Sequence, residues 1–233
     1  MNSIRERIAN WSASLPSELD VSSLYRRCPI AHKWKATFRI VLVRESSLWR
    51  MADLGGSFMH LVDHGDILAS RIVLRSACET SALLAYLNKK ILDLLSGQTD
   101  FASFNDVTKQ LLLGGKNTGD YYSPVNVMTA IGHFSKDVPE IQRIYDRLSE
   151  DAHPNASGMI YSYSSSDPET LETAFSRDRI LSSATVEHTV AAADLIFFCY
   201  EQQYNEIWPQ RFEALEQWLH DNDNTLEASR PDA

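Results

Sequence analysis

Two long runs of helical periodicity, joined by only three residues, constrain the fold of this chain more than any other feature. In the first run, apolar side chains recur at spacings of three, four and seven residues or their multiples: Trp34, Phe38, Val41, Leu48, Ala52 and Met59. The second run repeats this pattern: Val73, Ala77, Leu84, Leu87, Ile91 and Leu95. The periodicity predicts amphipathic helices over residues 31–64 and 66–95. Because the connection His64-Gly65-Asp66 is so short, the two helices must form an antiparallel hairpin.

Three residues on the first apolar stripe need a structural reason. Glu45 lies on this stripe, and an unpaired buried carboxylate is costly. We therefore expect Glu45 to lie near an end of the bundle or to pair with a cation. Gly55 and Gly56 each cost about 1 kcal/mol relative to alanine inside a helix. Their presence indicates that another helix approaches closely at this point.

The remaining periodic segments predict shorter helices. These are a helix from Phe104 to Leu113, one from Pro124 to about Lys136 capped by Ser123, one opened by Pro139, a long one capped by Ser182 or Ser183, and a short one after Pro209 to about His220. Between them, residues 116–123 read as a loop, and residues 155–178, rich in Ser, Gly and Tyr, favour a loop over a strand. The sum predicts an all-α helical bundle with essentially no sheet.

The order of these segments indicates one helical domain. We expect an N-terminal extension at residues 1–30, the helical domain at 31–221 and an acidic, disordered tail at 222–233. No apolar run approaches the roughly 20 residues that span a bilayer, and the N-terminus lacks the apolar region of a signal peptide. The three cysteines are far apart and form no C-x-x-C pattern, which is typical of reduced thiols. A cytoplasmic protein without a membrane partner is therefore expected.

The charge is negative overall but unevenly distributed. A net charge of −9 argues against a protein that coats nucleic acid without specificity. Residues 22–50, however, hold seven Lys or Arg and one Glu, whereas residues 201–233 hold two Arg and eight Asp or Glu. Two differently solvated faces would explain this asymmetry, and so would a basic groove that attracts phosphates.

Arg147 and His153 form the chemically most informative pair. Pro154 disfavours helical geometry at the residue before it, so His153 should end the helix that carries Arg147. An imidazole can transfer protons near neutral pH, and a guanidinium can hold a phosphate oxygen. The pair therefore suits phosphodiester chemistry, although a structural helix end with a surface histidine would give the same pattern.

Two motifs give this pair a wider context. The segment Tyr145-x-x-Leu148-Ser149-x-x-x-His153-Pro154-Asn155 resembles the Y-x-x-L-S-x-x-x-H-P signature of bacterial HEPN-like helical domains of unknown function. Upstream, Arg75-Ser-Ala-Cys-Glu79 resembles the R-x-x-x-E helix of the same group, at about the same interval. The resemblance covers about residues 35–205 and lies in order and spacing more than in identities.

This resemblance implies a function and a site. Many members of the wider HEPN superfamily are metal-independent ribonucleases with an R-x(4–6)-H motif, some of them with an added glutamate. It implies catalytic roles for Arg147, His153, Glu79 and Arg75, with no cofactor and no metal. We further expect Lys35, Arg39, Arg71, Ser149 and Asn155 to bind the substrate. The resemblance implies a homodimeric RNA-cleaving toxin or antiphage effector, with a neutralising protein as a further partner.

A non-catalytic helical module is the alternative. It would bind a nucleotide, a protein partner or a second copy of itself. Leu148 stands where the ribonuclease motif usually has a small polar residue, and Glu150 and Asp151 beside His153 should repel RNA phosphates. Both facts favour this alternative.

Two further groups of residues have a weaker pattern. His60 and His64 have the i, i+4 spacing of helical metal ligands, with Asp63 and Asp66 nearby, but the spacing alone is common. In the basic segment, Lys35 and Arg39 alternate with Trp34 and Phe38, a mixture used on single-stranded RNA. Aromatic side chains at helical spacing are more often core residues, and we expect that of Trp34 and Phe38.

Overall fold

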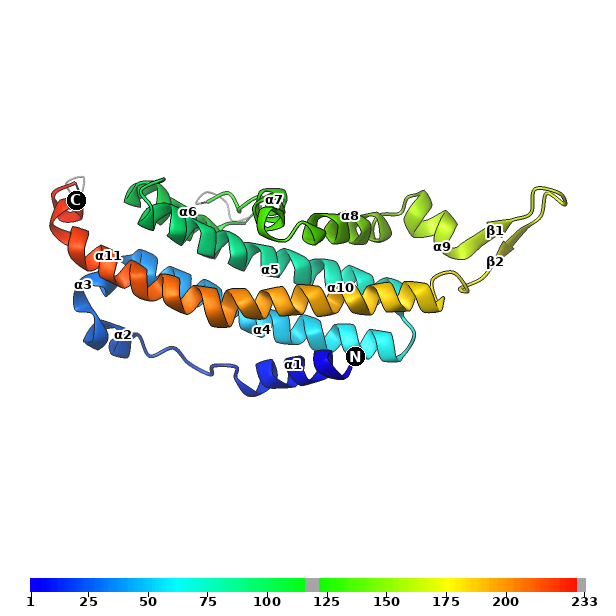
Figure 1. Ribbon diagram of the computed structural model, residues 1–233, viewed down its shortest axis with the longest axis horizontal. Helices are drawn as coiled ribbons and strands as arrows, with labels where there is room; N and C mark the ends of the chain where they lie inside the picture. Colours follow the sequence, from blue (N-terminus) through cyan, green and yellow to red (C-terminus); the bar gives the residue numbers. More distant parts are fainter. Residues whose placement is uncertain (116–121, 230–233) are drawn as a thin grey trace.

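The predicted helical hairpin forms the centre of the structure. The computed structural model describes residues 1–115 and 122–229, and in it α4 (Lys35–Asp63) and α5 (Ile67–Leu95) run antiparallel beside each other (Figure 1). Gly65 connects them with a φ of +73°, a backbone conformation that glycine adopts at little cost. The all-α fold class is thereby confirmed.

The other helices cover α5 on several sides. On one side lie α6 (Phe101–Leu113), α7 (Val127–Asp137) and α8 (Glu140–Ala152). On another lies α10 (Ser183–Glu201), which passes through the π-helical segment η2 (Gln202–Ile207) into α11 (Trp208–Ala228) (Figure 1). As a result, α5 has buried residues along its whole length, from Ile67 to Leu94.

The N-terminal segment belongs to the same bundle. Helix α1 (Asn2–Ala13) packs on α4 and α10, and its Ile4 and Trp11 are core residues. The indole Nε1 of Trp11 donates a hydrogen bond of 3.0 Å to Glu201. The short helices α2 (Val21–Arg27) and α3 (Pro29–His32) follow, and α3 packs against α11. Helices α1 and α3 of the N-terminal segment thus pack against the helices of the bundle.

A small β-hairpin projects beyond one end of the bundle. After α8 come the π-helical segment η1 (Ala156–Ile160) and the single turn α9 (Tyr161–Tyr163). Strands β1 (Ser164–Ser166) and β2 (Thr173–Phe175) then pair antiparallel, with Ser164 opposite Phe175 (Figure 1). The loop expected over residues 155–178 is therefore partly ordered, although the sheet is minimal.

Two predicted helix boundaries are wrong. Helix α7 begins after Asn126, because the Asn126 side chain accepts a hydrogen bond of 2.8 Å from the backbone N–H of Met128, and Ser123 does not cap it. At the C-terminus, α11 continues to Ala228 where a disordered tail was expected from residue 222. Asp223 explains this, because it accepts hydrogen bonds from Lys33 (2.7 Å) and from the indole of Trp34 (3.1 Å). The loop expected at residues 116–123 falls mostly outside the described residues.

The stripe residues Glu45 and Gly55 have the neighbours that were expected. Glu45 forms an ion pair with Arg44 and accepts a hydrogen bond of 2.7 Å from the Tyr204 hydroxyl. Burial raises the pKa of Tyr204 above its ordinary value, so this hydroxyl stays a donor. A Cβ atom on Gly55 would lie 2.9 Å from the Ile8 side chain of α1, whereas one on Gly56 would meet nothing within 4 Å. Only Gly55 therefore marks a close helix contact.

No helix in the described ranges is long and apolar enough to cross a membrane.

The two adjacent glycines should respond to substitution in opposite ways. We expect Gly55→Leu to lower the free energy of unfolding by about 1–3 kcal/mol, because the new side chain overpacks the contact between α4 and α1. Gly56→Ala is the matched control and should raise it by up to about 1 kcal/mol through helix propensity. Urea denaturation followed by circular dichroism measures both. Equal effects of the two substitutions would contradict the placement of α1.

Candidate anion-binding cleft

Helix α8 ends as its sequence predicts. His153 has extended backbone angles (φ −90°, ψ 143°), and its N–H donates to the carbonyl of Ser149 at 3.2 Å. Ile141, Tyr145 and Leu148 are the buried residues of α8 and fix the face that it turns to the bundle. The His153 side chain is exposed and makes no hydrogen bond or ion pair within the described part of the chain.

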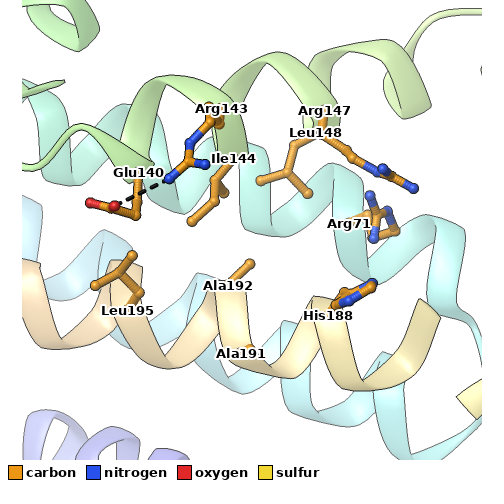
Figure 2. Close-up of a pocket in the computed structure, with 10 residues that line it drawn as sticks. All are labelled: Arg71, Glu140, Arg143, Ile144, Arg147, Leu148, His188, Ala191, Ala192 and Leu195. Atoms are coloured by element: carbon orange, nitrogen blue, oxygen red, sulfur yellow. Dashed lines mark hydrogen bonds and ion pairs between the residues drawn. The ribbon is translucent and has the colours of Figure 1, made fainter. Parts of the chain in front are cut away.

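Arg147 lies in a cleft with a different histidine. The cleft has a volume of about 430 Å³ and lies between α8, α5 and α10. Figure 2 shows Arg147 from α8, Arg71 from α5 and His188 from α10 gathered at one end of it. We call this the anion cleft, with the following lining residues: Arg71, Glu140, Arg143, Ile144, Arg147, Leu148, His188, Ala191, Ala192 and Leu195.

Arg71 is fixed in place by hydrogen bonds to two other helices. It is only 5% exposed, and its Nε donates to Oδ2 of Asp151 at 2.6 Å. Its Nη1 donates to Oγ1 of Thr189 on α10 at 2.8 Å. The Thr189 hydroxyl in turn donates to the carbonyl of Thr185 at 2.7 Å. A guanidinium held in this way loses little further freedom when it binds a ligand.

Arg147 and His188 differ from Arg71 because their side chains are available to bind a ligand. Both side chains are exposed, and neither forms a hydrogen bond or ion pair with another of the described residues. Their remaining donors can therefore turn to a ligand. Arginine presents a planar fork of donors that matches phosphate and carboxylate oxygens.

A second, smaller pocket continues the anion cleft toward the β-hairpin. Its volume is about 150 Å³, and it shares Arg71, Arg147 and His188 with the anion cleft. Arg179, Tyr161 and several hydroxyl groups complete its lining. Together the two pockets hold four arginines and only two carboxylates, Glu140 and Asp151. The site is thus positive within a chain whose net charge is −9.

Arg75 and Glu79 contact α8 but do not line either of these two pockets. Arg75 Nε lies 3.3 Å from Glu79 Oε1, and Tyr145 Oη donates to the same oxygen at 3.2 Å. The hydrogen bond to Tyr145 raises the pKa of Arg75. Tyr145 precedes His153 by eight residues, about 12 Å along a helix. Arg75 and Glu79 therefore form a network with Tyr145 of α8, and neither of them lines the pockets that hold Arg147.

The expected substrate-binding residues are divided between separate places. Lys35 and Arg39 line another pocket with Trp34 and Phe101, where Arg39 donates to Asn105 at 2.8 Å and burial lowers the pKa of Arg39. This pocket lies about 30 Å along the hairpin from Arg71. It is therefore separate from the anion cleft.

Asn155 and Ser149 do not line either of the two pockets. Asn155 caps η1 by accepting from the N–H of Gly158 at 2.9 Å, and it donates to Glu150 at 2.6 Å. The Ser149 hydroxyl is buried without a hydrogen-bond partner among the described residues. Of the five expected binding residues, only Arg71 lines the anion cleft.

Sequence reasoning missed His188, Thr189 and Arg179. Helix α10 was recognised by its buried stripe, and these residues lie beside that stripe or before the helix. One signal was present in the sequence: a run of three small residues, Ala191, Ala192 and Ala193, begins three positions after His188. Small residues on a helix leave room against its neighbour, and here Ala191 and Ala192 line the anion cleft.

The His60 and His64 pair has no metal-binding geometry around it. Their rings lie 4.2 Å apart, and Nδ1 of His64 lies 2.8 Å from the carbonyl oxygen of His60. Asp63 is bound by Arg5 at 2.6 Å. Over residues 1–115 and 122–229, no three His, Cys, Asp or Glu side chains are grouped so that they could hold a metal ion.

In comparisons with known proteins, no protein-family model, curated protein or solved structure matches this chain.

The pair of Arg71 and Asp151 should contribute strongly to stability. We expect Asp151→Ala to lower the free energy of unfolding by about 3 kcal/mol or more, because it leaves the Arg71 charge buried without its partner. Asp146→Ala removes an exposed carboxylate of the same helix and should change stability by less than about 0.5 kcal/mol. Chemical denaturation of both variants measures the difference, and a loss for Asp151→Ala no larger than that of the control would contradict it.

Proposed function

We propose that this chain binds a phosphate-bearing ligand in the anion cleft. The observation that carries the proposal is the meeting of Arg147, Arg71 and His188, from three different helices, at one end of a single cleft. Two arginines close together repel each other, so a bound anion would stabilise the arrangement. Asp151 relieves this repulsion only in part, because it pairs with Arg71 and has no contact with Arg147 among the described residues.

The geometry supports binding better than it supports a complete catalytic site in one chain. His153, Glu79 and Arg75, which the HEPN resemblance implies as catalytic, do not line the anion cleft with Arg147. A helical module that binds a nucleotide or a nucleic-acid phosphate needs only the cleft.

Metal-independent RNA cleavage is the second candidate, and one observation favours it. Arg147 and His153 are both exposed, at the end of the same helix, and His188 adds an imidazole beside Arg147. In such a reaction a histidine accepts the proton of the RNA 2′-hydroxyl, whose oxygen attacks the adjacent phosphorus. Arg147 stabilises the negative charge on the phosphorane. The 5′-oxygen leaves with a proton from a second acid, and a cyclic phosphate remains. A second copy of the chain, as in a homodimer, could supply His153 to the cleft.

Binding is tested with Arg147→Ala. We expect this variant to bind inorganic pyrophosphate and a short RNA at least about tenfold more weakly than the parent, because charge-assisted hydrogen bonds to phosphate contribute about 1.5–3 kcal/mol. Isothermal titration calorimetry at fixed salt measures the affinities. Arg26→Ala is the matched control, since the Arg26 side chain is 75% exposed and lies on α2, outside the cleft. If Arg147→Ala binds as tightly as the parent, or the parent binds neither ligand, the proposal fails.

Cleavage is tested with histidine variants and a chelator. If the chain cleaves RNA, cleavage should continue in EDTA, and His153→Ala should lower its rate by about 10²–10⁴-fold as the loss of a general acid or base does. His188→Ala, assayed in parallel, shows which imidazole transfers the proton. A gel assay of labelled RNA with purified protein measures the effect of EDTA and the cleavage rates of the two variants. If the parent cleaves none of a range of RNAs, or if both variants keep full activity, the cleavage proposal fails and the phosphate-binding module remains as the proposed function.

A further inference from the structure

The anion cleft has two ends of different chemistry. At one end are the cationic side chains Arg71, Arg147 and His188. At the other, Glu140 and Arg143 form an ion pair of 3.1 Å in which both side chains are more than half exposed. Figure 2 shows the two groups at opposite ends of the cleft, with apolar side chains between them. A ligand that fills the cleft must therefore carry an anion, an apolar body and a polar far edge.

The middle of the cleft suits a flat, apolar body. One wall is α8, with Ile144 and Leu148, and the other is α10, with Ala191 and Ala192 (Figure 2). Because the alanine side chains are small, they leave a narrow space between α10 and α8. The cleft volume of about 430 Å³ lies in the range of small-molecule sites, which are lined by apolar groups with a few polar groups that fix orientation.

The spacing of the two ends sets the length of the ligand. Arg147 and Glu140 are seven residues apart on α8, which corresponds to about 10 Å along the helix axis. This matches the extent of a nucleotide from its phosphate to the far edge of its base. A phosphate that carries an acyl chain would instead place its apolar end against the charged Glu140 and Arg143.

We infer that the anion cleft takes one nucleotide unit, with its phosphate on Arg71 and Arg147, its base between α8 and α10, and an exocyclic amine of the base on Glu140. A carboxylate accepts hydrogen bonds from base amino groups, and an arginine donates to base oxygens and ring nitrogens. Adenine, cytosine and guanine carry an amino group, and uracil does not. The inference rests on the proposed function, because the phosphate end of the nucleotide is the anion site proposed above. The unit can be a free nucleotide or the end of an RNA chain.

Calorimetric titration of the full chain with AMP, UMP and inorganic phosphate tests the inference. AMP should bind roughly tenfold more tightly than UMP, because one good contact to a base edge discriminates by about 1–3 kcal/mol. The difference in affinity between AMP and phosphate should be larger than that between AMP and UMP. In Glu140→Ala, which removes the acceptor, the ratio of AMP to UMP affinity should fall toward one, while phosphate binding stays unchanged. Glu140 is exposed at the start of α8, so this variant should fold.

A second variant tests the space between α8 and α10. Ala192→Leu should bring the affinity for AMP down to that for phosphate, because the larger side chain fills the space of the base. Ala184→Leu is its matched control, an exposed alanine of the same helix that does not line the cleft, and it should bind AMP like the parent. Thermal unfolding of both variants shows whether the fold is kept.

The outcomes separate this inference from the proposed function. If phosphate binds through Arg147 but AMP binds no more tightly, the nucleotide inference is overturned and the anion site remains. If UMP binds as tightly as AMP, or if Glu140→Ala keeps the parent's preference, recognition of the amine by Glu140 is overturned. If phosphate, AMP, pyrophosphate and a short RNA all fail to bind, both proposals fail. If AMP shows the expected preference over UMP and phosphate but a short RNA binds more tightly than AMP, the end of an RNA chain is the source of the nucleotide.

Discussion

The burial of α5 is the constraint on which the rest of the structure depends. It packs against α4, α6, α7, α8, α10 and α11, so helices lie around most of its circumference. The polar side chains of a helix in this position lie within the bundle, where an unpaired polar group costs free energy. The Asn88 side-chain N–H donates to the Gln203 carbonyl at 3.0 Å, and Arg71 donates to Asp151 and Thr189. These contacts fix how α8, α10 and η2 lie against the centre.

Arg71 connects this packing to the candidate function. Its bonds join three helices, and the same guanidinium forms part of the anion cleft. A buried ion pair contributes little net stability compared with apolar packing, although breaking one is costly. A site for an anion offers a reason for a charge at this position. It also implies that stability and ligand binding are coupled, because a bound anion stabilises the folded state.

The hairpin and the end of α8 could be predicted from the sequence because local rules determine them. Apolar spacing, Gly65 and Pro154 act within a few residues of their own positions. The cleft depends instead on contacts across the fold, as between Arg71 and Thr189, which are 118 residues apart. No spacing rule identifies such a pair. The same holds for the C-terminus, where the acidic composition suggested disorder but Lys33 pairs with Asp223 and Glu227.

The expectation that Arg147 and His153 act together on one phosphate also rests on sequence spacing alone. Residues six apart on an ideal helix point in directions about 120° different, because each turn holds 3.6 residues. Arg147 thereby lines the cleft toward α5 and α10, while His153, where α8 ends, remains exposed outside it. The imidazole that lines the cleft with Arg147 is therefore that of His188, which comes from another helix. The anion site accordingly does not depend on His153, and a spacing motif within one helix could not identify the histidine that lies beside Arg147.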